Sequence, residues 1–233
     1  MALYAIGDLH LSNYVDKPMD IFGPHWENHH EKIRQSWWDT VRAEDTVLIP
    51  GDISWGMNMQ EAMADLQWIE KLPGKKILIK GNHDYWWSSI SILNSTFSNM
   101  HFIQNNYFVY EDYAICGTRG WITPNSNKFS QRDEKIYHRE IHRLRLSLEA
   151  AKAAGYKKYI GMLHYPPTND EKEPSLFTEV FKAYDVEIVV YGHLHGEDAY
   201  GAGLMGPHNE TTYHLVSCDY LDFQLLKIKQ TKS

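Results

Sequence analysis

Five short apolar runs in this chain end directly in aspartate, asparagine or histidine, and this repeated pattern restricts the fold more than any other feature. Runs of this length next to glycine and proline are typical of buried strands. In open α/β sheets, ligands bind beyond the carboxyl ends of the strands, so the pattern predicts a site where these ends meet. The polar residues at the five ends are Asp8 and His10, Asp52, Asn82 with His83 and Asp84, His164, and His193 with His195.

The first half of the chain alternates expected strands with expected helices. Apolar spacing predicts helices over residues 26–42 and 58–71, between strands that end near residues 6, 49 and 79. This alternation favours parallel strands that are joined by helical crossovers.

The second half has a different texture. Short segments at 101–103, 107–110 and 113–116 predict antiparallel strands, and a long amphipathic pattern predicts a helix over 131–154. Further strands are expected at 159–163, 188–191, 213–217 and 223–229, with a short helix at 176–184. No linker or repeat interrupts the pattern, so we expect one domain over residues 1–233.

Composition excludes several classes of protein. The chain has 233 residues and a net charge of −7, which argues against a protein that lives wrapped on nucleic acid. Its two cysteines, Cys116 and Cys218, predict neither a disulfide framework nor a cysteine zinc site. No signal peptide and no apolar run of about 20 residues is found, so a cytoplasmic location and no membrane contact are expected.

The strand ends also have the composition of a metal site. Of the 13 histidines, five lie at these ends, where buried ionisable groups are costly unless they are paired or bind metal. Imidazole and carboxylate without thiolate suit Mn, Fe, Co or Zn. Seven candidate ligands exceed one mononuclear centre and therefore predict two ions: Asp8, His10, Asp52, Asn82, His164, His193 and His195.

The charge balance points to a phosphate. Two divalent ions carry +4, two aspartates return −2, and a bridging hydroxide leaves about +1. Two ions placed about 3.5–4 Å apart hold both oxygens of an in-line displacement and supply hydroxide near neutral pH.

The order Asp-x-His, Gly-Asp, Gly-Asn-His-Asp, His and Gly-His-x-His resembles the calcineurin-like metallophosphoesterase superfamily over residues 8–195. The resemblance implies a four-layer α/β/β/α sandwich with two mixed sheets. It also implies that Asp8, His10, Asp52 and His195 hold one ion, while Asp52 bridges to a second ion that is held by Asn82, His164 and His193.

The same resemblance implies roles for the catalytic groups. His83 would protonate the leaving group or hold the phosphate, and Asp84 would orient its ring. One departure is Trp55, which stands where many relatives have the second aspartate of Gly-Asp-x-x-Asp. That position is not a metal ligand in the family.

Several residues keep two interpretations. Arg119 lies between glycines, so it either binds a phosphate oxygen bidentately or is a surface arginine in a tight turn. Aromatic residues near the motifs form an apolar mouth for a base or aryl group, or simply pack: Trp55, Tyr85, Trp86, Trp121 and Tyr165.

Two further groups are interpreted as surface. His25, His29 and His30 are either a small metal cluster or a helix surface, and no carboxylate pattern completes the set. A basic stripe on the long helix meets a polyanion or lies in solvent: Arg132, Lys135, Arg139 and Arg143.

The sequence therefore predicts a dinuclear phosphoesterase with Mn, Fe or Zn as divalent or mixed-valence ions. A metal-bound hydroxide would attack a phosphate mono- or diester in line while His83 assists the leaving group. A phosphoprotein phosphatase, a nuclease and a non-catalytic scaffold of the same fold are the alternatives, and nucleic acid is not the favoured partner.

Overall fold

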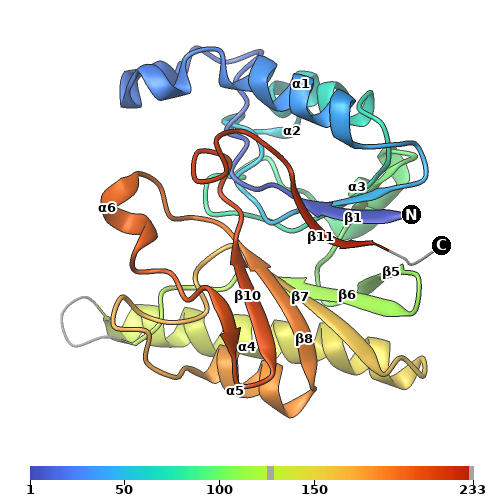
Figure 1. Ribbon diagram of the computed structural model, residues 1–233, viewed down its shortest axis with the longest axis vertical. Helices are drawn as coiled ribbons and strands as arrows, with labels where there is room; N and C mark the ends of the chain where they lie inside the picture. The colour runs from blue at the N-terminus through green and yellow to red at the C-terminus, as the bar shows by residue number, and fades with distance from the viewer. Residues whose placement is uncertain (125–128, 231–233) are drawn as a thin grey trace.

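Two β-sheets lie face to face between two layers of helices in the computed structural model, which describes residues 1–124 and 129–230 (Figure 1). The first sheet has the strand order β11-β1-β2-β3-β4 and the second has the order β5-β6-β7-β8-β10-β9. The strands of the first sheet are β1 (Ala2–Ala5), β2 (Thr46–Ile49), β3 (Lys75–Leu78), β4 (Met100–Phe102) and β11 (Leu226–Gln230). Those of the second are β5 (Tyr107–Tyr110), β6 (Tyr113–Thr118), β7 (Lys158–Leu163), β8 (Val186–Tyr191), β9 (Gly206–His208) and β10 (Thr211–Leu215).

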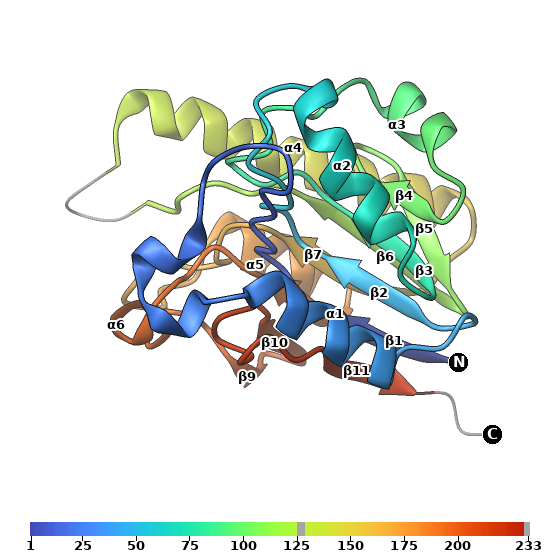
Figure 2. The same cartoon turned by 90° about the horizontal axis from the view of Figure 1, so that it is seen from above.

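Helices cover the outer face of each sheet (Figures 1 and 2). The first sheet is covered by α1 (His29–Thr40), α2 (Met59–Glu70) and α3 (Ile90–Thr96), and the second by α4 (Gln131–Ala153) and α5 (Leu176–Ala183). Three shorter helices lie together at one end of the molecule: η1 (Met19–Phe22), η2 (Pro24–Trp26) and α6 (Glu197–Tyr200).

Alternation along the strands explains why the two sheets can pack on both faces. In β1, Ala2 and Tyr4 belong to the core under the first helical layer, whereas Leu3 and Ala5 belong to the core between the sheets. Successive side chains of a strand point to opposite faces, so a run that is apolar at every position is buried on both sides. The result is the expected α/β fold with two mixed sheets flanked by helices.

The expected antiparallel direction is wrong for one strand. Met100–Phe102 pairs in parallel with β3 at the edge of the first sheet, while β5 and β6 form the expected antiparallel pair. A three-residue strand carries no pattern that fixes its direction. The direction follows instead from the crossover through α3, which returns the chain to the same end of the sheet.

The first sheet is completed by the most distant part of the chain. β1 pairs in parallel with β2 on one side and antiparallel with β11 on the other.

In the described part of the chain, no helix is both long and apolar enough to cross a membrane.

Candidate metal centre

The seven predicted metal ligands lie together beyond the carboxyl ends of five strands from both sheets. Asp8 and His10 follow β1, Asp52 follows β2, and Asn82 follows β3 in the first sheet. The second sheet contributes His164 after β7 and His193 with His195 after β8. Because β1, β2 and β3 are parallel in the first sheet and β7 and β8 are parallel in the second, the ends of strands that are far apart in sequence meet there.

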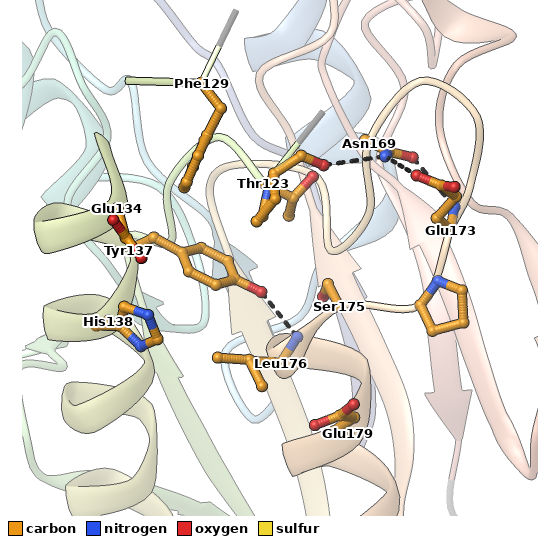
Figure 3. A pocket seen from close by; sticks show the side chains of 12 residues that line it. Thr123, Phe129, Glu134, Tyr137, His138, Asn169, Glu173, Ser175, Leu176 and Glu179 are labelled. Atoms are coloured by element: carbon orange, nitrogen blue, oxygen red, sulfur yellow. Dashed lines mark hydrogen bonds between the residues drawn. The ribbon is translucent and has the colours of Figure 1, made fainter. Parts of the chain in front are cut away.

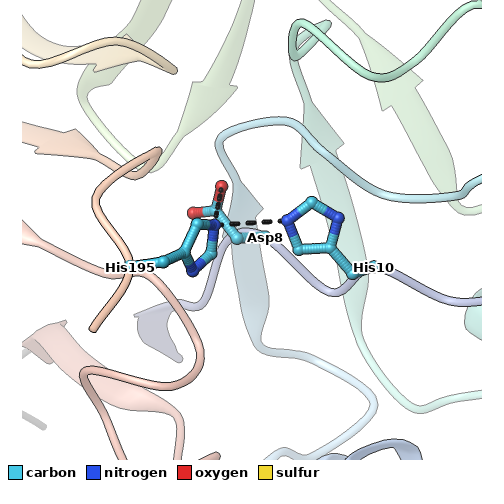
Figure 4. A group of neighbouring side chains, drawn as sticks. All are labelled: Asp8, His10 and His195. Atoms are coloured by element: carbon cyan, nitrogen blue, oxygen red, sulfur yellow. Dashed lines mark hydrogen bonds and ion pairs between the residues drawn. The ribbon is translucent and has the colours of Figure 1, made fainter. Parts of the chain in front are cut away.

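One set of donor atoms consists of Asp8, His10 and His195 (Figure 4). The Nε2 atoms of the two imidazoles are 3.2 Å apart, and Asp8 Oδ1 is 3.6 Å from His195 Nε2. Their ligand atoms all lie within 4.8 Å of one another.

A second set surrounds Asn82. Its Oδ1 lies 2.7 Å from His164 Nε2 and 3.0 Å from His193 Nδ1, and these two imidazole nitrogens are 3.2 Å apart. Asp52 lies between the two sets, because its Oδ2 is 3.5 Å from His164 Nε2 and 3.9 Å from His10 Nε2.

Hydrogen bonds outside the cluster orient the imidazole rings. His164 Nδ1 lies 3.0 Å from the carbonyl oxygen of Pro50, and His195 Nδ1 lies 3.0 Å from Asp219 Oδ1. Since both partners only accept, each Nδ1 carries a proton, and this contact turns each Nε2 toward the centre. This is the arrangement by which a partner outside the site fixes a metal-binding histidine.

The donor chemistry fits two metal ions. His164 Nε2 and Asn82 Oδ1 lie 2.7 Å apart and both accept when the proton of the neutral imidazole is on Nδ1. Separations of about 3 Å are those of neighbouring ligands at about 2.1 Å around one ion. Imidazole, amide and carboxylate together suit Mn, Fe or Zn.

Two glycines let the loops approach the carboxylates. A Cβ atom at Gly81 would collide with the carboxylate and backbone nitrogen of Asp52, and one at Gly192 would collide with the carboxylate of Asp8. The absence of a side chain therefore lets two loops of the first sheet meet at Gly81 and lets the two sheets meet at Gly192.

Backbone strain is concentrated in the same loops. Four predicted ligands have a positive φ, which is uncommon for residues with a side chain: Asp8 at 55°, His10 at 44°, Asp52 at 50° and His193 at 74°. Such conformations are maintained only where the surrounding structure imposes them, and they cluster at functional sites.

The pKa values of the two buried aspartates, Asp8 and Asp52, shift in opposite directions. Burial opposes ionisation of Asp8, but its contacts with His195 and the charges of His195, His164 and His10 lower its pKa. Burial and the negative charge of Asp8 raise the pKa of Asp52 to about 8. Among the histidines, burial lowers the pKa of His193 to about 3, whereas Asp219 and Asp8 outweigh burial and raise the pKa of His195 to about 10.

His83 lies beside the donors, and none of the contacts described for it makes it a member of either set. Its ring centroid is 5.9 Å from that of His10 and 4.6 Å from that of Trp55, and its backbone nitrogen donates to Asp52 Oδ1 at 2.8 Å. Burial, followed by the positive charges of His164 and Lys17, lowers its pKa.

The role expected for Asp84 is wrong. Its fully buried carboxylate accepts hydrogen bonds from the backbone nitrogens of Gly81, Asp52, Ile53 and Ser54 and from the Trp86 indole, not from the His83 ring. Five donors at 2.7–3.3 Å occupy both of its oxygens. Asp84 therefore fixes the loops that carry Asp52 and Asn82 relative to each other.

Arg119 forms an ion pair with a carboxylate outside the donor cluster. Its Nη2 lies 3.7 Å from the buried Glu140, and its guanidinium lies 4.6 Å from the centroid of Trp121. Its carbonyl accepts hydrogen bonds from the backbone nitrogens of His164 and Tyr165, so its main chain positions a predicted ligand.

Sequence reasoning missed Asp219, which orients His195 and also accepts from Tyr200 Oη at 2.8 Å. A signal was present, because Asp219 closely follows β10 and repeats the pattern of an acidic residue after an apolar run. The helix-surface interpretation of His29 is also wrong: it is buried, and its Nε2 lies 3.0 Å from the carbonyl oxygen of Leu9.

Two cavities have different relations to the centre. A cavity of about 290 Å³ is lined by three predicted site residues, His10, His83 and His195. A larger cavity of about 520 Å³ lies between α4 and the start of α5, where Leu176 donates its backbone N–H to Tyr137 Oη (Figure 3). None of the seven candidate ligands is among the described residues that line this larger cavity.

The comparison with known families agrees with this geometry. A profile described as calcineurin-like phosphoesterase matches residues 1–197. The chain belongs to the calcineurin-like phosphoesterase family. Members of this family are generally metal-dependent phosphoesterases, and the buried aspartate and histidine sets are compatible with its dinuclear site.

Two phage proteins are similar to part of the chain. The chain is 45% identical over 58 residues to the Gene 66 protein of Mycobacterium phage L5, and 40% identical over 78 residues to that of phage D29. These segments cover 25% and 33% of this chain and 28% and 37% of the phage proteins.

Two solved structures resemble the whole chain. The protein of unknown function AQ665 from Aquifex aeolicus has a TM-score of 0.53 and 15% identity, over 97% of this chain and 95% of that chain. The protein TT1561 of Thermus thermophilus has a TM-score of 0.55 and 12% identity, over 97% and 96% of the two chains.

Proposed function

We propose that this phosphoesterase family member hydrolyses a phosphate mono- or diester with two bound metal ions. The observation that supports this most strongly is the pair of acceptor-rich clusters on either side of Asp52. Cations bound among these buried groups would compensate for their close approach, and two divalent cations would make the site attractive to a phosphate.

The residues divide between the two proposed ions as follows. Asp8, His10, Asp52 and His195 would hold one ion, and Asp52, Asn82, His164 and His193 would hold the other. When bound, two divalent ions supply a water of lowered pKa and neutralise the charge on phosphate oxygens.

His83 is the proposed proton donor to the departing alcohol. It borders the donor cluster and lines the adjoining cavity, so an ester with its phosphate at the cluster would place its leaving oxygen near this ring. The negative phosphate would raise the pKa of His83 again and favour the protonated form that the step needs.

Arg119 is proposed to bind a phosphate oxygen. The Nε atom of Arg119 is buried without a hydrogen-bond partner. Tyr165, whose backbone nitrogen donates to the Arg119 carbonyl, packs on the predicted ligand His193 with ring centroids 4.1 Å apart. Binding would shift the guanidinium away from Glu140 toward the phosphate.

Metal removal and replacement test the proposal. We expect chelator-treated protein to lose hydrolysis of 4-nitrophenyl phosphate and bis(4-nitrophenyl) phosphate, and added Mn²⁺ to restore it, with metal content measured in parallel. Comparison of the two esters also separates a monoesterase from a diesterase. Full turnover by metal-free protein would rule out the two-metal mechanism.

The shared position of Asp52 gives a sharper test. Asp52→Asn should lower kcat/KM by more than about tenfold, because loss of a metal ligand exceeds the effect of its supporting groups, about 10–100-fold. Asp39→Asn is the matched control, since Asp39 is exposed on α1. If Asp52→Asn kept both its metals and its activity, the assignment of Asp52 as a bridge would be wrong.

A further inference from the structure

We propose that the cavity beside His83 binds an aromatic group on the alcohol side of the phosphoester. The inference rests on the proposed function and assigns the substrate class. Its apolar walls, which we call the aromatic vestibule, are Met19, Phe22, Trp26 and Trp55.

The aromatic vestibule opens directly onto the candidate centre. His10, His83 and His195 line the same cavity, so two predicted metal ligands and the proposed proton donor form its inner end. A phosphate at the donors would therefore direct the alcohol that His83 protonates into the vestibule.

Two of the walls are indole rings that pack against the site histidines. Trp55 stacks on His10 with centroids 4.9 Å apart and an interplanar angle of 23°, and it is 4.6 Å from His83. Trp26 lies 6.2 Å from His10 and 5.7 Å from His195. Aromatic groups pack favourably on such rings, by edge or offset contact.

The walls offer little to a polar alcohol. The indole nitrogen of Trp55 already donates to Met19 Sδ at 3.3 Å, and Phe22 has no polar group. A sugar or polyol placed here would lose hydrogen bonds to water without replacement, whereas an aromatic group loses none.

The volume suits one ring system. The cavity measures about 290 Å³, which is nearly twice the engineered cavity of about 150 Å³ that binds benzene. The remaining space accommodates the linking atoms of an ester or a larger bicyclic ring.

The mouth of the vestibule has an exposed apolar residue and a cation. Phe22 is 66% exposed, and Lys17 Nζ lies 4.6 Å from the centroid of Trp55. A ligand that covers Phe22 removes apolar surface from water, which is favourable at about 25 cal/mol per Å².

Esters with matched leaving groups test the inference. Methyl and benzyl esters both release a primary alcohol, so their intrinsic reactivity is similar and binding of the ring decides the difference. The assay uses Mn²⁺-loaded protein and whichever series, monoester or diester, is hydrolysed. We expect kcat/KM for the benzyl ester to exceed that for the methyl ester by about tenfold or more. A nucleoside 5′-phosphate arm distinguishes a base from a simple aryl group, and preference for either over methyl supports the vestibule.

Phe22→Ala supplies the decisive variant, because an exposed side chain can be removed without affecting folding. We expect the benzyl-to-methyl ratio to fall about tenfold. Ile21→Ala is the matched control: Ile21 is 73% exposed in the same short helix and is not among the described lining residues, so the ratio should stay unchanged.

Binding measured without turnover separates this inference from the proposed function. Calorimetry should show that benzylphosphonate binds more tightly than methylphosphonate and that Phe22→Ala removes the difference. Hydrolysis with no preference between benzyl, nucleoside and methyl esters would overturn the vestibule alone. Tighter benzylphosphonate binding without hydrolysis of any ester would instead overturn the proposed function and leave the vestibule standing.

Discussion

At the scale of single residues, His83 lies between the donor cluster and the aromatic vestibule. Esters that differ in their leaving group therefore separate proton donation by His83 from a purely electrostatic effect on the phosphate. Protonation matters most when the departing alcohol is a poor leaving group. We expect His83→Ala to lower kcat/KM on alkyl esters by about 10²–10⁴-fold and on nitrophenyl esters much less. The measurement is kcat/KM for both ester types together with metal analysis.

The control for this prediction is the metal content of the variant. It should equal that of the wild type, because His83 is outside both proposed ligand sets. Equal losses on both esters with metals retained would indicate a purely electrostatic role. Loss of metal would make His83 a ligand.

Asp219 should act on the metal through His195. Asp219→Asn leaves the His195 ring without its charged acceptor, so we expect Mn²⁺ affinity to fall about 10–100-fold, as for other partners of metal-binding histidines. Titration of chelator-treated protein with Mn²⁺ measures this. Asp222→Asn is the control in the same loop, since its side chain is 84% exposed; an equal fall in both variants would contradict the role of Asp219.

Residue identities were predictable where the chemistry follows an apolar run directly. This is why sequence reasoning found Asp8, Asp52 and His164 as candidates before their contacts were known. The assignment of Asp84 to the His83 ring failed because adjacent residues in a turn need not face each other. Only the folded loops show that the Asp84 carboxylate points to backbone amides.

At the scale of elements, α4 is joined to the second sheet by one buried carboxylate. Glu140 accepts from the Thr118 hydroxyl at 2.6 Å and pairs with Arg143 at 3.0 Å and Arg139 at 3.3 Å. Arg119 pairs with the same carboxylate from the second sheet, and Arg139 and Arg143 are half of the basic stripe that sequence analysis assigned to solvent or a polyanion. Two of its arginines instead stabilise a carboxylate with no exposed surface.

Glu140→Gln should therefore destabilise the protein by about 2–3 kcal/mol. Breaking a buried ion pair costs about 3–5 kcal/mol, and the partly exposed arginines recover some of this from water. Urea unfolding measures the change. Glu134→Gln, on the exposed face of the same helix, should cost about 1 kcal/mol at most, and similar losses in the two variants would contradict a special role for Glu140.

Elements with long periodic patterns were predictable, but of the four vestibule walls only Trp55 was proposed from the sequence, as part of an apolar mouth. The long helix expected over 131–154 is confirmed as Gln131–Ala153. The composition of residues 13–25 predicts a packed loop beside the site, but their pattern does not indicate that Met19 and Phe22 meet Trp55. Their meeting depends on tertiary packing between the η1–η2 segment and the loop after β2.

At the scale of the whole molecule, the proposed ions connect the two sheets. Asp8, His10, Asp52 and Asn82 come from the first sheet, and the three remaining ligands come from the second. A metal ion that binds only the folded state should raise the free energy of unfolding. The gain is about 2.7 kcal/mol when the free metal concentration is 100 times the dissociation constant. Thermal unfolding with and without Mn²⁺ measures this gain.

The corresponding control is His164→Ala, which removes a ligand from the second sheet. Its melting temperature should respond less to Mn²⁺ than that of the wild type. An unchanged melting temperature for wild-type protein across saturating Mn²⁺ would show that no ion links the sheets.

The pairing of β1 with β11 also affects how the chain folds during its synthesis on the ribosome. About 220 residues separate the two strands, so at 5–20 residues per second the first strand is made roughly 10–45 s before its antiparallel neighbour. During that interval the nascent chain exposes an unpaired edge of apolar strand beside four of the seven predicted metal ligands, and such edges invite pairing with other chains. A chaperone that shields the newly made first half would therefore do most for the yield of active protein, and emergence of β11 from the ribosome would set the moment at which the first sheet closes.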